Sequence, residues 1–284
     1  MRSIKKIHKA QYRPIGDLVT YSPLPLAQLQ QIDPFLLLNH HGPQVYEADN
    51  DGLPFGPHPH RGMETVTFII DGDIMHQDNA HHKSVIFAGG IQWMTAGRGV
   101  IHSEVSSDAF KKEGGNMEIL QMWLNLPASL KMTEPYYKGF QESEIPTVLL
   151  DKGNVRIQVI SGEWDGIKGA HKSITNVHLY ECHMKAGASF KTTIPIDQNI
   201  FFYAVRGSVI VNNSKAQKLD LVEFNNDAEE LNIEAIEDSI IIIGHAVPFN
   251  EPTVSYGPFV MNTEDEIQQA YKDYRAGKFG KWED

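Results

Sequence analysis

Short apolar segments recur along most of the chain, and glycine, asparagine or aspartate residues separate them. The separating turns include Asp71-Gly72-Asp73, Gly89-Gly90, Arg206-Gly207 and Asn212-Asn213, whose residue types favour tight hairpin connections. The segments that we predict as strands are Thr65–Ile70, Ser84–Phe87, Ile91–Thr95, Glu118–Leu124, Val155–Ser161, His178–His183, Ile200–Val205, Ser208–Val211 and Ile240–Gly244. Many short strands with closely spaced turns predict an all-β sandwich or barrel rather than alternating strands and helices.

One segment near the end of the chain has a helical pattern instead. Thr263 is followed three residues later by Glu266, which is the spacing of a capping box, and Gly277 supplies a stop signal. The apolar positions between them that fall on one helical face are Ile267, Ala270, Tyr271 and Tyr274. We therefore expect an amphipathic helix over residues 264–276 that packs against a sheet.

The length of 284 residues suits two domains of middling size. Thr65–Gly72 and Phe201–Gly207 are both apolar strands that run into a glycine turn, which indicates two copies of one β fold. The stretch from Pro127 to Pro146 has three prolines and mixed polarity, so it predicts a connection with at most a short helix. We expect an N-terminal domain over residues 1–134, a linker over 135–146, and a C-terminal domain over 147–284 that includes the terminal helix.

Charge and composition exclude several classes of partner. The formal net charge of −11 argues against direct nucleic acid binding, which needs clustered lysine and arginine. A purely apolar run such as Ile240–Ile243 is far too short to span a bilayer, and the N-terminal stretch lacks the apolar segment of a signal peptide. A single cysteine, Cys182, excludes an internal disulfide and suits a reducing compartment. We expect a cytoplasmic, monomeric protein.

Two short motifs carry donor atoms for a metal ion. His58 and His60 are two positions apart, as are His102 and Glu104, so on a strand each pair points to one face, about 6.5–7 Å apart. Two such strands facing each other would aim three imidazoles and one carboxylate at one point. This donor set suits a divalent first-row transition ion and leaves coordination positions open for a ligand. Glu64 shares the strand parity of His58 and is the alternative carboxylate.

These motifs resemble those of a known family. The spacing G-x5-H-x-H-x3-E-x7-G, which runs from Gly52 to Gly72, resembles the first motif of the cupin superfamily. Within that superfamily, HPHRGMETVTFIIDGDIMH and IQWMTAGRGVIHSE resemble the signature of the pirin family. The likeness continues through Asp33–Leu38, Leu124–Pro127 and Tyr256–Thr263, so it spans nearly the whole chain.

The resemblance has consequences for the fold and for the site. It implies an all-β bicupin, with two double-stranded β-helix (jelly-roll-like) antiparallel barrels, a short C-terminal helix, and a metal ion in the N-terminal domain only. Position by position, it implies that the metal ligands are His58, His60, His102 and Glu104. Glu64 is then either a residue beside the ligands or a buried structural acid.

The same resemblance implies a function. Pirin relatives are linked to quercetin 2,3-dioxygenase activity, in which dioxygen opens a flavonol ring and carbon monoxide is released. Fe(II) is the expected ion, with nickel, copper, manganese and zinc as alternatives, and Glu104 would accept the proton of the flavonol 3-hydroxyl. Two alternatives stay open. The metal ion could only make the barrel rigid, or the protein could be a non-enzymatic, iron-dependent regulator of transcription or of a metabolic enzyme, acting through a protein partner.

The remaining histidines form no motif of this kind. Three of them are expected in exposed loops, namely His76, His81 and His82. Two are candidates for the edge of the pocket, namely His40 and His41. In the second half, His178 and His183 are five positions apart and should face opposite sides of a strand, while His245 stands alone. That half therefore predicts no comparable site.

Five residues beside the ligand motifs have two interpretations each. Arg61 and Arg98 would either steer an anionic substrate or pair with a nearby carboxylate. Trp93, Met94 and Phe55 would supply either pocket walls or core packing.

Overall fold

The computed structural model describes residues 1–282 and divides the chain into two compact units. Unit 1 contains Met1–Gln11, Ser22–Pro34 and Ser143–Pro248. Unit 2 contains Tyr12–Tyr21, Phe35–Glu142 and the residues from Phe249 onward. Strands form nearly all of the regular structure in both units, which confirms the predicted all-β class.

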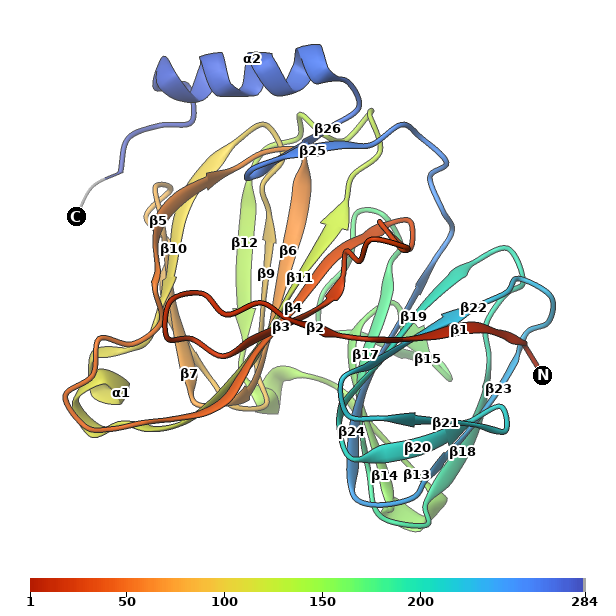
Figure 1. Cartoon of the computed structure of the whole chain (residues 1–284). Helices are drawn as coiled ribbons and strands as arrows, with labels where there is room; N and C mark the ends of the chain where they lie inside the picture. The colour runs from red at the N-terminus through yellow and green to blue at the C-terminus, as the bar shows by residue number, and fades with distance from the viewer. Residues whose placement is uncertain (283–284) are drawn as a thin grey trace. The chain divides into compact units, whose positions relative to one another are not determined.

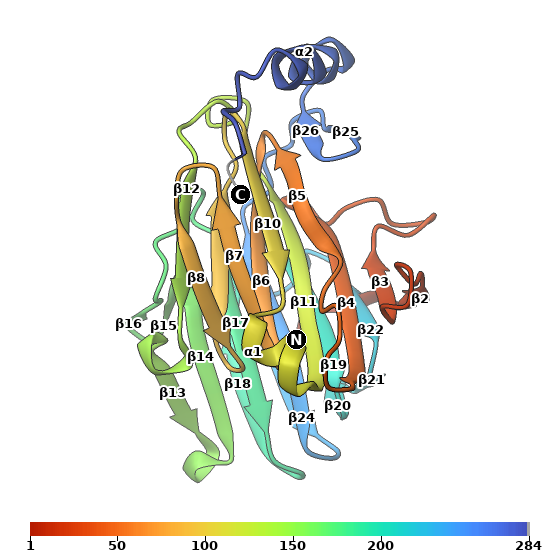
Figure 2. The same ribbon diagram turned by 90° about the vertical axis from the view of Figure 1, so that its left-hand side faces the viewer.

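Unit 2 is built from two sheets. The larger one has the strand order β12-β9-β6-β11-β4-β3-β2, and the smaller one has the order β5-β10-β7-β8, whose four strands Figure 2 shows side by side. Ile69 and Ile119 from the larger sheet pack with Ile74 and Ile86 from the smaller one, so the core lies between the two sheets. The strands are β2 (Gln11–Tyr12), β3 (Thr20–Leu24), β4 (Phe35–Tyr46), β5 (Phe55–His60), β6 (Met63–Asp71), β7 (Asp73–Asp78), β8 (Lys83–Phe87), β9 (Ile91–Thr95), β10 (Val100–Val105), β11 (Gly115–Asn125) and β12 (Tyr136–Phe140).

Unit 1 has the same construction. Its larger sheet has the order β1-β22-β19-β24-β17-β14-β13, and its smaller sheet has the order β18-β23-β20-β21. The strands are β1 (Ile4–Lys9), β13 (Thr147–Leu150), β14 (Val155–Ser161), β17 (His178–Met184), β18 (Ser189–Thr193), β19 (Asn199–Arg206), β20 (Ser208–Val211), β21 (Ser214–Gln217), β22 (Asp220–Phe224), β23 (Glu230–Ala235) and β24 (Ser239–Ala246). A small separate hairpin joins β15 (Glu163–Trp164) to β16 (Ile167–Lys168).

The two units therefore repeat one fold, as the paired apolar segments predict. Those segments form β6 and β19, which are the third strands of the two seven-stranded sheets. Each strand ends at a glycine with positive φ, 84° at Gly72 and 73° at Gly207, where a residue with a side chain would be strained. The same turn chemistry thus closes the same hairpin in both units. Two sandwiches of seven and four strands confirm the predicted bicupin architecture.

The predicted terminal helix forms as α2 (Glu264–Arg275). Its capping box is complete, because the Thr263 side chain accepts from the Glu266 backbone and the Glu266 side chain accepts from the Thr263 backbone. Figure 1 shows α2 over the hairpin of β25 (Val254–Tyr256) and β26 (Phe259–Met261). Its buried residues Ile267 and Ala270 pack in one cluster with Phe259 of this hairpin and with Ile101 of β10.

The compact units divide the chain at other places than the expected domain ranges. The residues from Phe249 onward, which include α2, belong to unit 2, because their apolar side chains pack on β10. Within the expected linker, Tyr136–Phe140 forms the edge strand β12, paired with β9, and a short 3-10 turn follows at Glu142–Glu144.

A short helix that the sequence pattern does not reveal, α1 (Asp108–Glu113), is capped by Ser107, whose side chain accepts from the Phe110 backbone. Within residues 1–282, no helix has the length and the apolar character needed to cross a membrane.

Candidate metal centre

Three histidines from two neighbouring strands converge inside unit 2. His58 and His60 lie on β5, and His102 lies on β10 as the direct register partner of His58. One donor nitrogen of each ring lies within 4.8 Å of those of the other two. The ring centroids are 4.4 Å apart for His58 and His102, 4.9 Å for His58 and His60, and 5.0 Å for His60 and His102. The i, i+2 spacing on paired strands thus brings the three predicted imidazoles together.

Hydrogen bonds orient two of these rings. The Nδ1 of His58 lies 2.7 Å from the Gly56 carbonyl oxygen, and the Nδ1 of His60 lies 3.1 Å from the Pro258 carbonyl oxygen. A carbonyl only accepts, so each Nδ1 carries the proton and each Nε2 keeps its lone pair for a metal ion. Among the described residues, neither ring nitrogen of the buried His102 has a hydrogen-bond partner. A buried polar atom without a partner is costly, and a metal ion would supply the missing interaction.

Burial keeps the rings of His60 and His102 uncharged. Desolvation, together with the neighbouring His58, lowers the pKa of His60 to about 3, against a smaller opposing effect of the Pro258 hydrogen bond. Desolvation, followed by the proximity of His58, His60 and His76, lowers the pKa of His102 well below its usual value. Neutral imidazoles are the form that binds metal ions, so His60 and His102 are in the form that a divalent transition ion needs.

Glu104 is placed by its own hydrogen bonds. It is buried on β10 and lines the same cavity as His58 and His60. Its Oε1 lies 2.8 Å from the Thr67 hydroxyl, and its Oε2 accepts from the Gln121 amide at 3.1 Å. Each carboxylate oxygen has a second lone pair, so these contacts leave acceptor capacity on both oxygens. The cluster of mutually close donor atoms contains the three histidines only, so Glu104 as fourth ligand stays a prediction.

Glu64, the alternative carboxylate, is fully buried on β6. Its Oε1 accepts from the Thr95 hydroxyl at 2.6 Å and from the Trp93 indole at 3.1 Å. Desolvation raises its pKa, although both hydrogen bonds act in the opposite direction. These contacts fit the interpretation of Glu64 as a buried structural acid that ties β6 to β9.

A cavity of about 250 Å³ opens onto His58 and His60 of this cluster. Its walls are largely apolar, with Leu37, Phe55, Ile74, Ile119 and Trp123 among the lining residues. The ring of Trp123 also stands edge-on to His60, with centroids 5.3 Å apart. An apolar cavity that ends at a few polar groups is the usual form of a small-molecule site.

His76 lies behind His102 and not in an exposed loop, so that expectation was wrong. The Asp71-Gly72-Asp73 turn is so short that β7 begins at Asp73, and strand alternation then buries the His76 side chain. Its ring stacks on Tyr137 with centroids 3.6 Å apart, and its centroid is 5.4 Å from that of His102. His81 and His82 are exposed, as expected.

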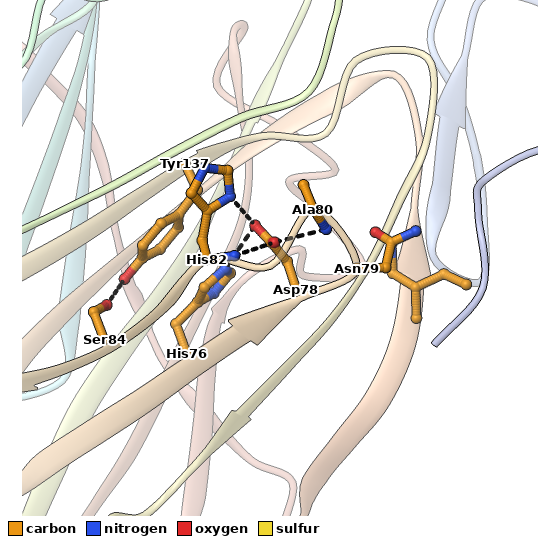
Figure 3. Close-up of polar contacts among 8 residues, drawn as sticks. His76, Asp78, Asn79, Ala80, His82, Ser84 and Tyr137 are labelled. Carbon is orange, nitrogen blue, oxygen red and sulfur yellow. Dashed lines mark hydrogen bonds and ion pairs between the residues drawn. The ribbon is translucent and has the colours of Figure 1, made fainter. Parts of the chain in front are cut away.

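Asp78 joins His76 to the exposed His82 (Figure 3). Its Oδ2 accepts from His76 Nε2 at 3.2 Å and from His82 Nδ1 at 2.8 Å, and its Oδ1 accepts from the backbones of Ala80 and His82. Burial alone would raise the pKa of Asp78, but the hydrogen bonds outweigh it and lower the pKa to about 2. The ionised carboxylate therefore fixes the orientation of His76, which packs against the candidate ligand His102.

Of the other residues that the sequence offered for the pocket, some line the cavity and others lie elsewhere. His41 lines the cavity, whereas His40 points to Glu118, with Nε2 and Oε1 2.8 Å apart. Arg61 pairs with Asp273 at 2.8 Å, and Arg98 pairs with Glu134 at 2.9 Å, which confirms the interpretation as structural pairs. Trp93 and Met94 are buried core residues, whereas Phe55 is a wall of the cavity.

The second half was expected to have no site, but it does gather histidines. His178 on β17 and His245 on β24 are register partners, and their rings stack with centroids 4.3 Å apart. His245 does not stand alone, because strand pairing brings it to His178 from a position 67 residues away in the sequence. His183 is turned to Glu181 instead, with Nε2 and Oε1 2.7 Å apart.

Two repeated β-sandwich units, one of them with a cluster of three histidines inside, define a bicupin with a candidate metal centre in one barrel. The chain belongs to the pirin family. The pirin family model matches residues 17–124, and the model of the pirin C-terminal cupin domain matches residues 179–280.

Similar proteins cover almost the full length. A pirin-like protein of Caulobacter vibrioides is 34% identical over 98% of this chain and 99% of its own. The structure of a quercetin 2,3-dioxygenase from Acinetobacter baumannii is 32% identical, covers 99% of both chains and superposes with a TM-score of 0.93. A bacterial pirin from Escherichia coli, whose structure was solved in complex with nickel(II), shares the fold at 22% identity, with a TM-score of 0.68 over 86% of this chain and 99% of its own.

Proposed function

We propose that this protein is a metal-dependent dioxygenase of the quercetin 2,3-dioxygenase type, which opens a flavonol ring with dioxygen and releases carbon monoxide. The observation that carries the proposal is the end of the unit 2 cavity, where His58 and His60, which cluster with His102, meet apolar walls. The similarity to the Acinetobacter baumannii quercetin 2,3-dioxygenase over 99% of both chains supports the same chemistry.

His58, His60 and His102 would hold the ion, with Glu104 as fourth ligand. Three nitrogens and one oxygen leave two positions of an octahedron for guests. When bound, a divalent ion supplies positive charge that stabilises an oxyanion and lowers the pKa of a coordinated hydroxyl. Fe(II) is our first choice of ion, and nickel is the leading alternative, because the Escherichia coli pirin was solved with nickel(II).

Glu104 is the proposed acceptor of the substrate proton. Thr67 and Gln121 hold its two carboxylate oxygens in place, which leaves little side-chain freedom. The Gln121 amide donates to Oε2, so a neutral partner orients the carboxylate. A positioned carboxylate of this kind typically contributes a factor of about 10² to 10⁴ to the rate.

The apolar walls would exclude water from the reacting ring. Leu37, Phe55 and Trp123 offer flat or aliphatic surfaces but no charge to an aromatic substrate. The volume of about 250 Å³ lies slightly below the about 300–1,000 Å³ of ordinary ligand pockets. We infer that the ring with the 3-hydroxyl enters the cavity and that the second ring system stays at its mouth.

The decisive experiment is anaerobic purification with metal quantification, followed by oxygen uptake. Protein loaded with Fe(II) or Ni(II) is given quercetin, and oxygen consumption and carbon monoxide release are measured. A flavone that lacks the 3-hydroxyl is the matched control, since it has no proton for Glu104 to accept. Stoichiometric oxygen and carbon monoxide with quercetin alone support the proposal, whereas the loaded protein consuming no oxygen with any flavonol would end it.

The small cavity favours a second candidate, an iron-dependent regulator that acts through a protein partner. In that function the ion's oxidation state alters a surface, and no substrate needs to enter. The two functions differ in one measurement, because a regulator changes its affinity for a partner on iron oxidation without turning over a flavonol. The cytoplasmic location and the monomeric state stay predictions.

A further inference from the structure

We propose that a cavity in unit 1 is a second small-molecule site, which takes an uncharged, hydroxylated aromatic compound without a metal ion. Its volume is about 480 Å³, compared with about 250 Å³ for the cavity at the three histidines, and it falls within the about 300–1,000 Å³ of ordinary ligand pockets. This site lies outside the proposed dioxygenase centre and does not depend on its activity.

The cavity occupies the same place in its barrel as the metal cavity does in unit 2. It is lined by residues of β17, β18, β23 and β24, which hold the sheet positions that β4, β5, β10 and β11 hold in unit 2. A duplicated fold has thus kept its pocket in both copies. Because the two pockets lie between equivalent strands, their chemistry differs only through the side chains that line them.

Those side chains exclude a copy of the metal centre. In unit 2, the equivalent pair of strands places His58 opposite His102. In unit 1, the inward-facing register pairs of β18 and β23 are Phe190 with Ile233 and Thr192 with Leu231. The unit 1 histidines come instead from the opposite sheet, and their stacked rings, only 18° from parallel, do not converge as ligands.

A hydrogen-bonded group of three rings lines the cavity. His178 Nδ1 accepts from the Glu163 backbone N–H at 3.3 Å, so the ring proton of neutral His178 is on Nε2. His245 Nδ1 donates to the Gln198 side-chain oxygen, so its Nε2 has a free lone pair, 3.4 Å from the Tyr180 hydroxyl. The one proton of the Tyr180 hydroxyl is shared by two acceptors, the Glu163 carbonyl oxygen at 2.7 Å and His178 Nδ1 at 3.0 Å. The group therefore offers both a donor and an acceptor, which is what a ligand hydroxyl needs.

Charge argues against an anionic ligand. The carboxylates of Glu163, Asp165 and Glu230 line the cavity, and Lys191 is its one lysine or arginine among the described residues. Burial, followed by His178 and Arg2, lowers the pKa of His245 to about 3, so the ring adds no positive charge near neutral pH. The three carboxylates are on exposed residues, so they bring no charge to the buried part of the wall. The deep part of the site is therefore neutral.

The apolar residues that line the unit 1 cavity indicate the rest of the ligand's structure. Trp164, Ile194 and Leu231 line the cavity beside the histidine rings. Flat indole and imidazole surfaces suit an aromatic ring, and the His178–Tyr180–His245 group suits its hydroxyl. An uncharged phenol-type compound satisfies both parts of the wall at once.

The test compares two probes with the same ring system, 2-naphthol and 2-naphthoate, by calorimetry on the metal-loaded protein and by crystal soaks. We expect 2-naphthol to occupy the unit 1 cavity with its hydroxyl at His245, and 2-naphthoate to bind at least tenfold more weakly. His245→Leu should weaken 2-naphthol binding about tenfold. Tyr180→Phe, which keeps the ring and removes only the hydroxyl, should weaken it at least threefold if the barrel is intact by circular dichroism.

His58→Ala is the matched control, because it disturbs the metal centre of unit 2 and should leave 2-naphthol binding in unit 1 unchanged. Binding that persists in this variant and falls in His245→Leu supports the second site whether or not the dioxygenase proposal holds. The inference is overturned if 2-naphthol is absent from the unit 1 cavity, if His245→Leu binds as wild type, or if 2-naphthoate binds equally well.

Discussion

His58 and His102 face each other as register partners on β5 and β10, with ring centroids 4.4 Å apart. The pairing fixes the geometry of the centre at the level of the backbone, because antiparallel register partners on one face are the closest side chains in a sheet. His60 is two residues from His58 on the same strand, so its side chain faces the same side and joins the cluster. The centre is therefore a property of two paired strands and not of flexible loops.

Removal of one ligand tests the centre directly. His102→Ala should lose at least nine-tenths of the bound metal, because a pair of histidines holds a divalent ion far more weakly than three. Metal content per chain after anaerobic purification, by elemental analysis, is the measurement. The exposed His81 supplies the matched control, and His81→Ala should keep the wild-type content. Full metal content in His102→Ala would place the ion elsewhere.

Glu104→Gln separates metal binding from proton transfer. The amide keeps the shape and one oxygen of the side chain, so most of the metal should remain. The proton acceptor is lost, and we expect kcat with quercetin to fall about 100-fold or more. Oxygen uptake normalised to metal content is the readout, and Glu64→Gln is the comparison, because Glu64 bonds to Trp93 and Thr95. Unchanged turnover in Glu104→Gln would remove Glu104 from the chemistry.

Local patterns foretold the parts of the fold that depend on neighbouring residues. The strands Ile91–Thr95, Val155–Ser161 and Ser208–Val211 have the predicted bounds, and the capping box at Thr263 starts α2 where expected. The three histidines were found because the donor spacing and the strand period coincide. Such features need only a few consecutive residues to be visible.

Features made by distant pairing stayed hidden. The stack of His178 on His245 exists because β17 pairs with β24, and the residue spacing within either strand does not predict this contact. Strand β12 is held as an edge strand by β9, although its proline-flanked sequence resembles a linker. The packing of the C-terminal segment with unit 2 depends on Phe259 and Ile101, residues that are 158 positions apart.

The Arg61–Asp273 pair should stabilise the attachment of α2 within unit 2. The pair is largely buried, with nitrogen and oxygen 2.8 Å apart, and Phe279 packs on the guanidinium at 4.5 Å. Asp273→Asn leaves the Arg61 charge buried without its partner, and we expect a loss of about 2 kcal/mol in the free energy of unfolding.

Chemical denaturation of metal-free protein measures this loss without interference from metal binding at the neighbouring candidate ligand His60. The control is the exposed pair of Arg98 and Glu134, where Arg98→Gln should cost less than about 1 kcal/mol. An equal, small cost for both variants would show that burial adds nothing to the Arg61–Asp273 pair.

Lys131 should make stability depend on pH in the alkaline range. Its side chain is 1% exposed, and its Nζ donates to the Gly62 carbonyl at 2.9 Å, to the Asn125 side chain at 2.7 Å and to the Val260 carbonyl at 3.2 Å. Burial lowers its pKa from 10.5 to about 8, although Glu251 and Glu266 act in the opposite direction. Between these two pKa values the unfolded chain holds a proton at Lys131 that the folded chain has released. Unfolding therefore takes up a proton, and stability rises with pH across this window.

The contribution of Lys131 to this rise amounts to at most about 3 kcal/mol between pH 8 and pH 10.5. The measurement is the free energy of unfolding across this range for wild type and for Lys131→Met, because the difference between them cancels the titration of all other groups. Wild type should gain stability relative to the variant as the pH rises, while the exposed Lys172→Met should run parallel to wild type. If the curves of wild type and Lys131→Met are parallel instead, the three oxygen acceptors hold the ammonium charge strongly enough to cancel the effect of burial.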